Sequence, residues 1–324
     1  MTIVIVSREG TGSSLCGGSL VAPNMVLTAA HCRGDKYTVI LGAHELSNTD
    51  EPTREYFDVV EQIIHPQHRT EGVEYYDAML LILDAESTYD SVTLDGFGGE
   101  RLDLVNTETL VTIGFGTTGI SNSTDDDTSE TLQETEVRFS DAQACKNLYG
   151  SASDNTILID TTIHLCAGSV VTASCTGDSG GPLLKKMENG SFVEVGLVSW
   201  GPTGCLYPPF PVVYTNVGEI YPWVSLTSCS WAPSSSICID SMNFIWPSAT
   251  PTVSMSPTLT PTSVSTTGNP TMTQTIAPNP QNDENDSDSV PSDDKEDSGS
   301  VPVASRATIA SVCFISWMLQ LAFF

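Results

Sequence analysis

The sequence predicts an all-β fold for residues 1–230, built as a sandwich or a barrel. Short apolar runs recur through this region, and Gly, Pro, Asn and Asp separate them, whereas amphipathic patterns of helix length are scarce. A block of this size can bury a core of its own. The clearest strand-like runs are TIVIV at 2–6, KYTVILGA at 36–43, AMLLIL at 78–83, LVTIGFG at 110–116 and FVEVGLVSWG at 192–201.

Composition restricts the class of protein. Acidic residues outnumber basic ones 40 to 12, and the net charge of −28 argues against nucleic acid as a partner, because phosphates would be repelled. Nine cysteines without a CxxC pair or a zinc-type histidine spacing indicate disulfides formed in an oxidising compartment. N-x-S/T triplets at Asn122, Asn189 and Asn285 are compatible with secretion. We therefore expect an extracellular protein.

Beyond residue 230 the composition changes three times. Residues 231–247 form a short Cys-containing extension, and 248–298 are rich in Ser, Thr and Pro and then acidic, which is typical of an extended stalk. Residues 299–324 end in an apolar run preceded by small residues. That pattern suits a GPI-attachment signal, and its length also suits a transmembrane helix. The tail therefore predicts a cell-surface anchor of either kind.

Three polar residues stand beside strand-like or glycine-rich segments in a pattern that suits nucleophilic catalysis. Ser179 lies in TGDSGGP, His31 ends the run VLTAAH, and Asp77 precedes the apolar run AMLLIL. A serine hydroxyl needs a base within hydrogen-bond reach, and histidine is the base suited to neutral pH. The histidine in turn needs an acceptor that fixes its tautomer and stabilises its charged form. A glycine-rich turn with a purely structural serine remains the alternative for TGDSGGP alone.

Four motifs together resemble the chymotrypsin/trypsin-like serine peptidase family over nearly all of residues 1–230. They are CGGSL with VLTAAHC, then DAMLL, then C-TGDSGGP, and finally VSWG-PTGC. The resemblance implies two six-stranded antiparallel β-barrels with the active site in the cleft between them. It assigns His31 as general base, Asp77 as its orienting acid and Ser179 as nucleophile, with the backbone N–H groups of Gly177 and Ser179 as the oxyanion hole.

The same resemblance implies how the cysteines pair. Cys313 lies in the apolar tail, and two cysteines beyond the matched region are expected to pair with each other. The expected disulfides are Cys16–Cys32, Cys145–Cys166, Cys175–Cys205 and Cys229–Cys238.

Family resemblance also suggests the substrate preference. The position that forms the floor of the primary specificity pocket is Ala173, so a cationic substrate side chain would find no partner charge there. Val212 stands where glycine is usual and should narrow the pocket, which favours small to medium apolar P1 residues. The residues expected to line the substrate site are Ala173, Ser174, Ser199, Trp200, Gly201 and Val212. The strand that contains Ser199, Trp200 and Gly201 should pair with an extended substrate through its backbone.

Neither a cofactor nor a metal ion is expected. Calcium-binding members carry a glutamate where this chain has Ala43, although acidic residues at 51–61 surround that region. We expect a monomer whose partners are protein or peptide substrates, protein inhibitors, an activating protease and, through its tail, a membrane.

Asp178 raises a question about activation. In the family this aspartate pairs with an Ile/Val amino terminus freed by cleavage, and residues 1–15 contain neither such a start nor a signal peptide. Two interpretations follow: the working chain begins before Met1, or the protein stays in a zymogen-like state with Asp178 turned outward. The second interpretation is compatible with a catalytically silent surface homologue that acts as a binding or decoy protein.

Overall fold

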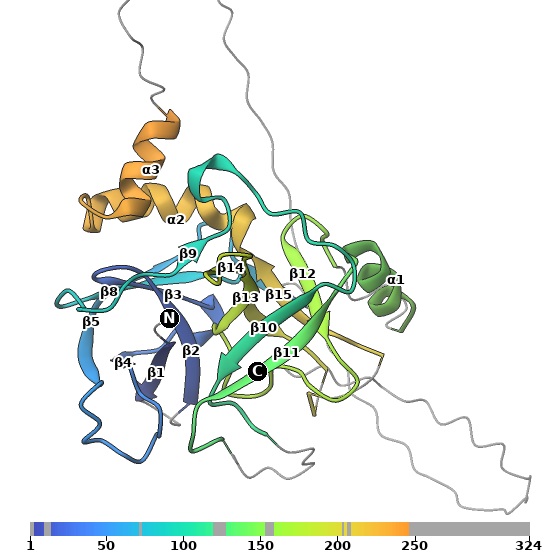
Figure 1. Cartoon of the computed structure of the whole chain (residues 1–324), viewed down its shortest axis with the longest axis horizontal. Helices are drawn as coiled ribbons and strands as arrows, with labels where there is room; N and C mark the ends of the chain where they lie inside the picture. The colour runs from blue at the N-terminus through green and yellow to red at the C-terminus, as the bar shows by residue number, and fades with distance from the viewer. Residues whose placement is uncertain are drawn as a thin grey trace, which may run out of the picture. The chain divides into compact units, whose positions relative to one another are not determined.

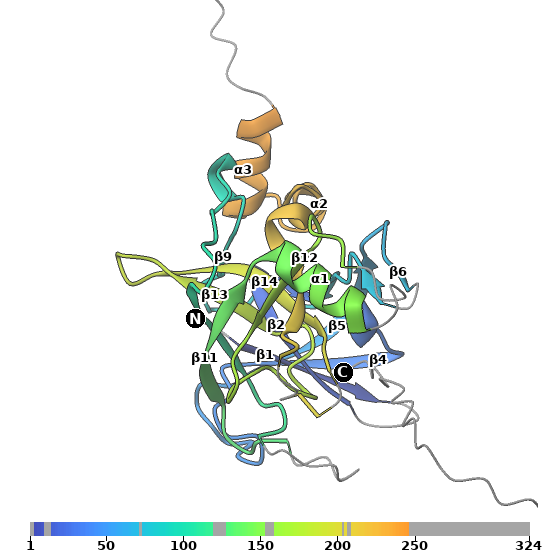
Figure 2. The same cartoon turned by 90° about the vertical axis from the view of Figure 1, so that its right-hand side faces the viewer.

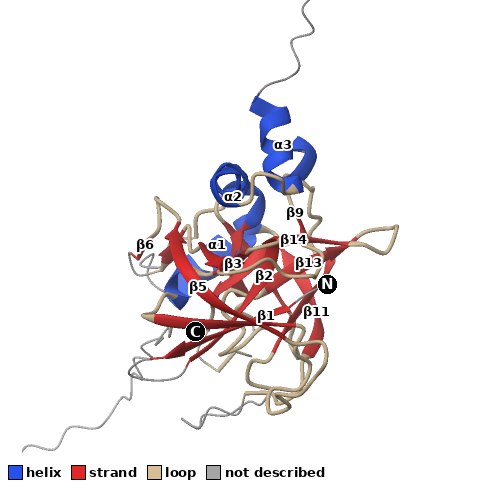
Figure 3. Cartoon of the chain, turned by 90° about the vertical axis from the view of Figure 1, so that its left-hand side faces the viewer, coloured by secondary structure: helices blue, strands red, loops and turns tan. Residues whose placement is uncertain are grey.

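A computed structural model describes residues 3–9, 14–70, 73–118, 128–152, 159–202, 204–205 and 209–245. The expected stalk and anchor, Cys313, Asn122 and Asn285 lie outside these residues. Within them strands dominate, as Figure 3 shows.

The first half of the described chain forms a closed barrel. Its six strands follow one another in the order β1-β2-β3-β8-β5-β4, and every neighbouring pair is antiparallel (Figure 1). The strands are β1 (Ile3–Glu9), β2 (Ser14–Ala22), β3 (Met25–Thr28), β4 (Lys36–Leu41), β5 (Glu55–Ile64) and β8 (Met79–Leu83). A hairpin of β6 (Arg69–Thr70) and β7 (Glu74–Tyr75) interrupts the path from β5 to β8.

The second half forms a seven-stranded sheet in the order β13-β10-β11-β12-β15-β14-β9. Because β13 also pairs with β14, six of these strands close into a second antiparallel barrel, and the short β9 joins β14 in parallel. The strands are β9 (Thr93–Leu94), β10 (Thr109–Gly114), β11 (Gln133–Ser140), β12 (His164–Gly168), β13 (Pro182–Lys186), β14 (Phe192–Trp200) and β15 (Val212–Asn216). The predicted fold class of two six-stranded barrels is confirmed.

The central strand β8 shows why its sequence lacks polar alternation. All five residues of MLLIL are buried, because each face of the strand packs against a different core. Met79, Leu81 and Leu83 face the interior of the first barrel. Leu80 and Ile82 face a second cluster that includes residues of α2 (Val217–Trp231). An uninterrupted apolar run therefore belongs to a strand buried on both faces, with Asp77 just before its first residue.

Helices occupy the outside of the two barrels. The helix α1 (Ala142–Ala152) lies beside β12, whereas α2 and α3 (Ser236–Ile245) lie together on another side (Figures 1 and 2). Two 3₁₀ turns, η1 (Ala30–Cys32) and η2 (Phe97–Gly99), complete the described elements. The extension expected at 231–247 thus contains a helix, which the sequence did not predict. None of the helices within the described ranges is long and apolar enough to cross a membrane.

Candidate active site

His31 and Asp77 meet between the first barrel and the second. His31 lies in η1, directly after β3, and Asp77 precedes β8, which pairs with β3. The His31 ring nitrogen Nδ1 lies 2.6 Å from Asp77 Oδ2, and the His31 backbone N–H donates to Asp77 Oδ1 at 2.9 Å. One carboxylate therefore fixes both the backbone and the ring of the histidine. This geometry leaves Nε2 as the ring nitrogen that can accept a proton.

The Asp77 carboxylate is fully buried and held from the second barrel as well. Ser199 Oγ in β14 donates to Asp77 Oδ2 at 2.6 Å, and Thr215 Oγ1 in β15 donates to the Asp77 backbone carbonyl at 3.0 Å. Burial acts to raise the pKa of Asp77, but the His31 charge and the hydrogen bonds from His31 and Ser199 outweigh it, so the pKa lies below its ordinary value. Asp77 is therefore ionised at neutral pH.

Ser199 and Thr215 are the contacts that sequence reasoning missed. We expected Ser199 only in the substrate strand, whereas its hydroxyl points at the aspartate. The signal available in the sequence was weak, since a small polar residue inside the apolar strand β14 predicts only that its side chain has a partner.

The serine turn is held against the loop that carries His31. The Ser179 carbonyl accepts the Gly17 N–H at 2.8 Å, and Cys32 Sγ lies 3.6 Å from the same oxygen. A Cβ on Gly180 would lie 2.6 Å from the Ala29 backbone nitrogen, so the turn can approach η1 only with glycine there. The structure therefore holds the serine turn against the segment that contains His31.

Two features of the turn suit nucleophilic chemistry. The Ser179 Oγ is buried and has no hydrogen-bond partner within the described chain. Gly177 has a φ of +96°, and neither its N–H nor that of Ser179 donates to another described backbone group. These two N–H groups are thus free of local partners, which an oxyanion hole requires.

Asp178 points inward, not outward. Its two carboxylate oxygens each accept a backbone N–H at 2.8 Å, one from Gly116 and one from Cys175. A Cβ on Gly116 would lie 2.4 Å from Asp178 Oδ2, and a Cβ on Gly114 would lie 2.0 Å from Oδ1, so glycine at both positions makes room for the carboxylate. Burial raises the pKa of Asp178 to about 6, although the two N–H donors lower it.

A cavity of about 230 Å³ borders the Asp178 carboxylate. Its walls come from the start of the second barrel and from the segment before the serine turn. They include Gly114, Gly116, Thr135, Ala173 and Cys175. The cavity therefore lies directly beside a carboxylate whose ionised form lacks a cationic partner in the described residues.

The expected specificity residues lie where the second barrel meets the serine segment. Val212 is fully buried and packs in the same apolar cluster as the partly buried Ala173. Ser174 is also buried, and its hydroxyl lies 3.0 Å from Thr112 Oγ1 and 2.9 Å from Tyr214 Oη. A branched side chain thus occupies the space next to Ala173, and no charged group is among these contacts.

The remaining residues of the expected substrate strand are also enclosed. Trp200 is only 2% exposed and packs edge-on against Tyr149 at 5.2 Å between ring centroids. Gly201 follows it and is buried.

Four disulfides join the cysteines in the expected pairs. Cys16–Cys32 links β2 to η1, Cys145–Cys166 links α1 to β12, and Cys175–Cys205 links the serine segment to the chain after β14. Cys229–Cys238 links α2 to α3.

His164, for which no role was expected, fixes the backbone close to Asp77. His164 is 1% exposed; its Nδ1 accepts the Asp160 N–H at 3.1 Å, so its Nε2 carries the proton and donates to the Glu74 carbonyl at 2.8 Å. Burial lowers the pKa of His164, which keeps the ring neutral. This bond fixes the backbone of β7 three residues before Asp77.

The loop after Ala43 is organised by an arginine. The Arg54 guanidinium is almost fully buried and donates to Glu51 Oε2 at 2.9 Å and to the Leu46 carbonyl at 3.1 Å. Glu51 also accepts the backbone N–H groups of His44 and Glu45. These oxygens already face a cation that belongs to the chain, so the loop does not fit a calcium ion.

Two closed barrels, a His–Asp pair between them and a serine in a glycine turn define a protein of the serine peptidase class. The family model for Trypsin matches residues 2–224, and the chain belongs to this family. Kallikrein-8 of Homo sapiens is 36% identical over 214 residues, which cover 65% of this chain and 75% of that protein. Chymase of Papio hamadryas is 32% identical over 224 residues, covering 68% and 81%.

Other comparisons agree. Proclotting enzyme of Tachypleus tridentatus is 31% identical over 241 residues, which cover 69% of this chain and 61% of that enzyme. Among solved structures, GrC matches with a TM-score of 0.58 at 27% identity, covering 69% of this chain and 92% of that one. Neuropsin, a serine protease expressed in the limbic system of mouse brain, matches with a TM-score of 0.57 at 28% identity, covering 69% and 93%.

Proposed function

We propose that the chain is a serine endopeptidase that hydrolyses peptide bonds through an acyl-enzyme. The observation that carries this proposal is the buried Asp77 carboxylate, which receives the His31 ring at 2.6 Å while Ser199 holds it from the other barrel. In the proposed reaction His31 takes the proton of Ser179 as its Oγ attacks the carbonyl carbon. Asp77 stabilises the resulting imidazolium, which then delivers the proton to the leaving amine.

The turn would stabilise the tetrahedral intermediate. The N–H groups of Gly177 and Ser179 would donate to the oxyanion, and a donor of this kind contributes about 10² to 10³ in kcat. Water then attacks the acyl-enzyme, and His31 takes a proton from the water as it attacks. His31 next returns this proton to Ser179 Oγ, and the carboxylic acid product leaves.

A fluorophosphonate probe tests the proposal. The activated full chain should become labelled, and Ser179→Ala should remove the label. Ser47→Ala is the matched control, because Ser47 is exposed and lies in the loop after β4, and it should label like the wild type. An activated chain that folds but takes no label would favour the alternative of a silent surface homologue acting as a binding or decoy protein.

The proposed P1 preference is for small to medium apolar side chains. It is supported by Ala173 at the expected pocket floor and by Val212, which fills space beside it. Hydrolysis of Ala, Val, Leu and Arg substrates measures this preference directly. Val212→Gly should shift activity toward larger P1 residues, and Ala173→Asp should add cleavage after Arg. Faster cleavage after Arg by the wild type would contradict the proposal.

Activation is proposed to involve Asp178. An α-ammonium group that enters the cavity beside its carboxylate would supply the missing positive charge, and a cleaving protease would free that group. Carbamylation of α-amino groups in the active enzyme should then abolish labelling, and labelling that survives complete carbamylation would contradict this step.

The proposed location is extracellular, with the enzyme as a monomer held at the cell surface. Support comes from the four disulfides, which form and persist in oxidising compartments. The proposed organisation is a peptidase domain over 1–230, an extension over 231–247, a stalk over 248–298 and an anchor over 299–324. Release from cells by phosphatidylinositol-specific phospholipase C would indicate a GPI anchor, and retention would indicate a transmembrane helix.

A further inference from the structure

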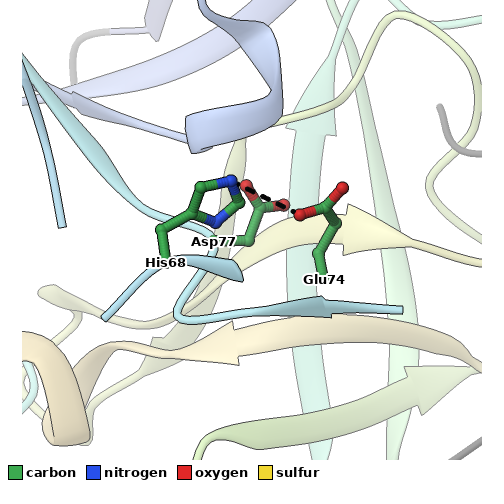
Figure 4. A group of neighbouring side chains, drawn as sticks. All are labelled: His68, Glu74 and Asp77. Atoms are coloured by element: carbon green, nitrogen blue, oxygen red, sulfur yellow. Dashed lines mark ion pairs between the residues drawn. The ribbon is translucent and has the colours of Figure 1, made fainter. Parts of the chain in front are cut away.

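Three potential metal ligands lie close together, and one of them is the Asp77 of the His–Asp pair. His68 precedes β6, Glu74 lies in β7 and Asp77 precedes β8, and their side chains point toward one another (Figure 4). One ligand atom from each lies within 4.8 Å of the other two. His68 Nε2 lies 3.5 Å from Glu74 Oε2. We call these three residues the His68 cluster.

The orientation of the His68 ring is that of a metal ligand. Its Nδ1 lies 3.3 Å from the Tyr75 carbonyl oxygen, which can only accept, so Nδ1 carries a proton. Nε2 then faces the Glu74 carboxylate, with which a protonated ring forms an ion pair (Figure 4). A metal ion bound between these two atoms would take the place of that proton. Imidazoles that bind metals commonly donate their other ring N–H to a backbone carbonyl in this way.

The two carboxylates of the cluster are buried close together. Glu74 is 6% exposed and Asp77 is 0% exposed. Besides His68, the partner of Glu74 among the described residues is the neutral Thr70 hydroxyl at 2.8 Å. Two negative charges that share one enclosed site repel each other, and a dication between them would remove that repulsion. Thr70 would hold a ligating Glu74 in place, as Ser199 holds Asp77.

The set of ligand atoms selects the kind of metal. One imidazole nitrogen and two carboxylate oxygens suit Zn²⁺, whereas the nitrogen disfavours Ca²⁺ and Mg²⁺. Ligand atoms on a tetrahedral Zn²⁺ lie roughly 3.4 Å apart. The His68–Glu74 separation of 3.5 Å already fits, and Asp77 fits after the ligands approach by up to about 1.4 Å. His68 is the least buried of the three.

We propose that His68, Glu74 and Asp77 bind one Zn²⁺ ion and that this ion reversibly inhibits the peptidase. The inhibitory part rests on the proposed function, because it concerns the carboxylate that serves His31. A metal on Asp77 withdraws negative charge from the oxygen that stabilises the imidazolium and places positive charge near it. The transition state, in which His31 is charged, is then destabilised. No metal was expected from the sequence, because it has no CxxC pair or zinc-type histidine spacing and has Ala43 where calcium-binding members carry a glutamate.

Zinc binding is measured first without reference to activity. Isothermal titration of the full chain carrying Ser179→Ala with ZnCl₂ should show one site. His68→Gln and Glu74→Gln should each weaken it at least tenfold, as expected for loss of a ligand. His44→Gln is the matched control, because His44 is exposed and lies outside the cluster, and it should bind like the parent. Absence of binding, or equal binding by His68→Gln, would overturn the proposed site.

Inhibition is then measured with the activated enzyme. Zn²⁺ should inhibit hydrolysis of a peptide substrate, and EDTA should restore it. His68→Gln, which leaves Asp77 and His31 in place, should remain active and need at least tenfold more Zn²⁺, whereas His44→Gln should match the wild type. Binding without inhibition would overturn the coupling to catalysis. An inactive chain that still binds Zn²⁺ would contradict the proposed function and leave the metal site standing.

Discussion

Glu194 should make the stability of this protein fall as pH rises. Its side chain lies in β14 and is fully buried, and neither carboxylate oxygen has a hydrogen bond within the described chain. Burial raises the pKa of Glu194 to about 8 from 4.5, and the nearby Ser19 hydroxyl only partly opposes this. The folded protein therefore holds one more proton than the unfolded chain between these two values. Its free energy of unfolding should decrease across that window and level off above pH 8.

The magnitude follows from the width of the window. At 1.36 kcal/mol per pKa unit, the shift from 4.5 to about 8 corresponds to roughly 5 kcal/mol at alkaline pH, and roughly 3 to 4 kcal/mol of it is lost between pH 5 and 8. Glu194→Leu should remove this loss and raise stability at pH 8, because an apolar side chain suits the site. Glu194→Gln should remove the pH dependence while keeping a buried polar group.

Urea unfolding of the Ser179→Ala chain with its disulfides intact measures the effect at pH 5, 6, 7 and 8. The free energy of unfolding of the parent should fall relative to that of Glu194→Leu over this series. Glu188→Gln, at an exposed position of the same hairpin, should behave like the parent. A parent and a Glu194→Leu variant whose difference stays constant within about 1 kcal/mol from pH 5 to 8 would refute the reasoning.

Three substitutions test the site itself. Asp77→Asn should lower kcat about 10⁴-fold with little change in KM, because the amide favours the wrong His31 tautomer, and an effect on KM alone would contradict this. Ser199→Ala should lower kcat roughly ten- to hundredfold, the effect of losing a hydrogen bond to a charged group, and unchanged kinetics would show that the bond is dispensable. Gly116→Ala should displace Asp178 and slow fluorophosphonate labelling of the folded chain roughly 10²-fold or more; normal labelling would show that the carboxylate can stay in place.

The all-β class and the three principal site residues could be predicted from local patterns, whereas the arrangement into two six-stranded barrels came from family resemblance. The run MLLIL indicates a buried strand, and TGDSGGP indicates a turn, in which Gly177 and Gly180 adopt positive φ values that other residues rarely adopt. Their partnership across 102 residues, from Asp77 to Ser179, came from family resemblance and not from periodicity. The same holds for the disulfides, whose pairing local sequence cannot decide.

The sequence did not predict the side-chain hydrogen bonds that join distant parts of the chain around the site. The bond from Ser199 to Asp77 joins residues 122 positions apart, and the bond from His164 to the Glu74 carbonyl joins residues 90 apart. No sequence motif marks either hydrogen bond, because local sequence does not decide which side chain a Ser or His will contact once the barrels pack together. Glu194 was missed for a related reason, since a single glutamate in an apolar strand reads as a solvent-facing position.

The inward position of Asp178 would link the proposed activation to the charge state of one carboxylate. With its two N–H donors and no cation, Asp178 has a pKa raised to about 6, so at neutral pH its inward, ionised form costs the fold stability. An ammonium group in the adjoining cavity would lower that pKa and turn the cost into an attraction. Because Ser179 follows Asp178 directly, the same charge pair would hold the N–H groups of the serine turn in position. Gly114 and Gly116 leave room for the Asp178 carboxylate with or without an ammonium group in the cavity. The ammonium group would therefore change the energy of the inward position and not its geometry.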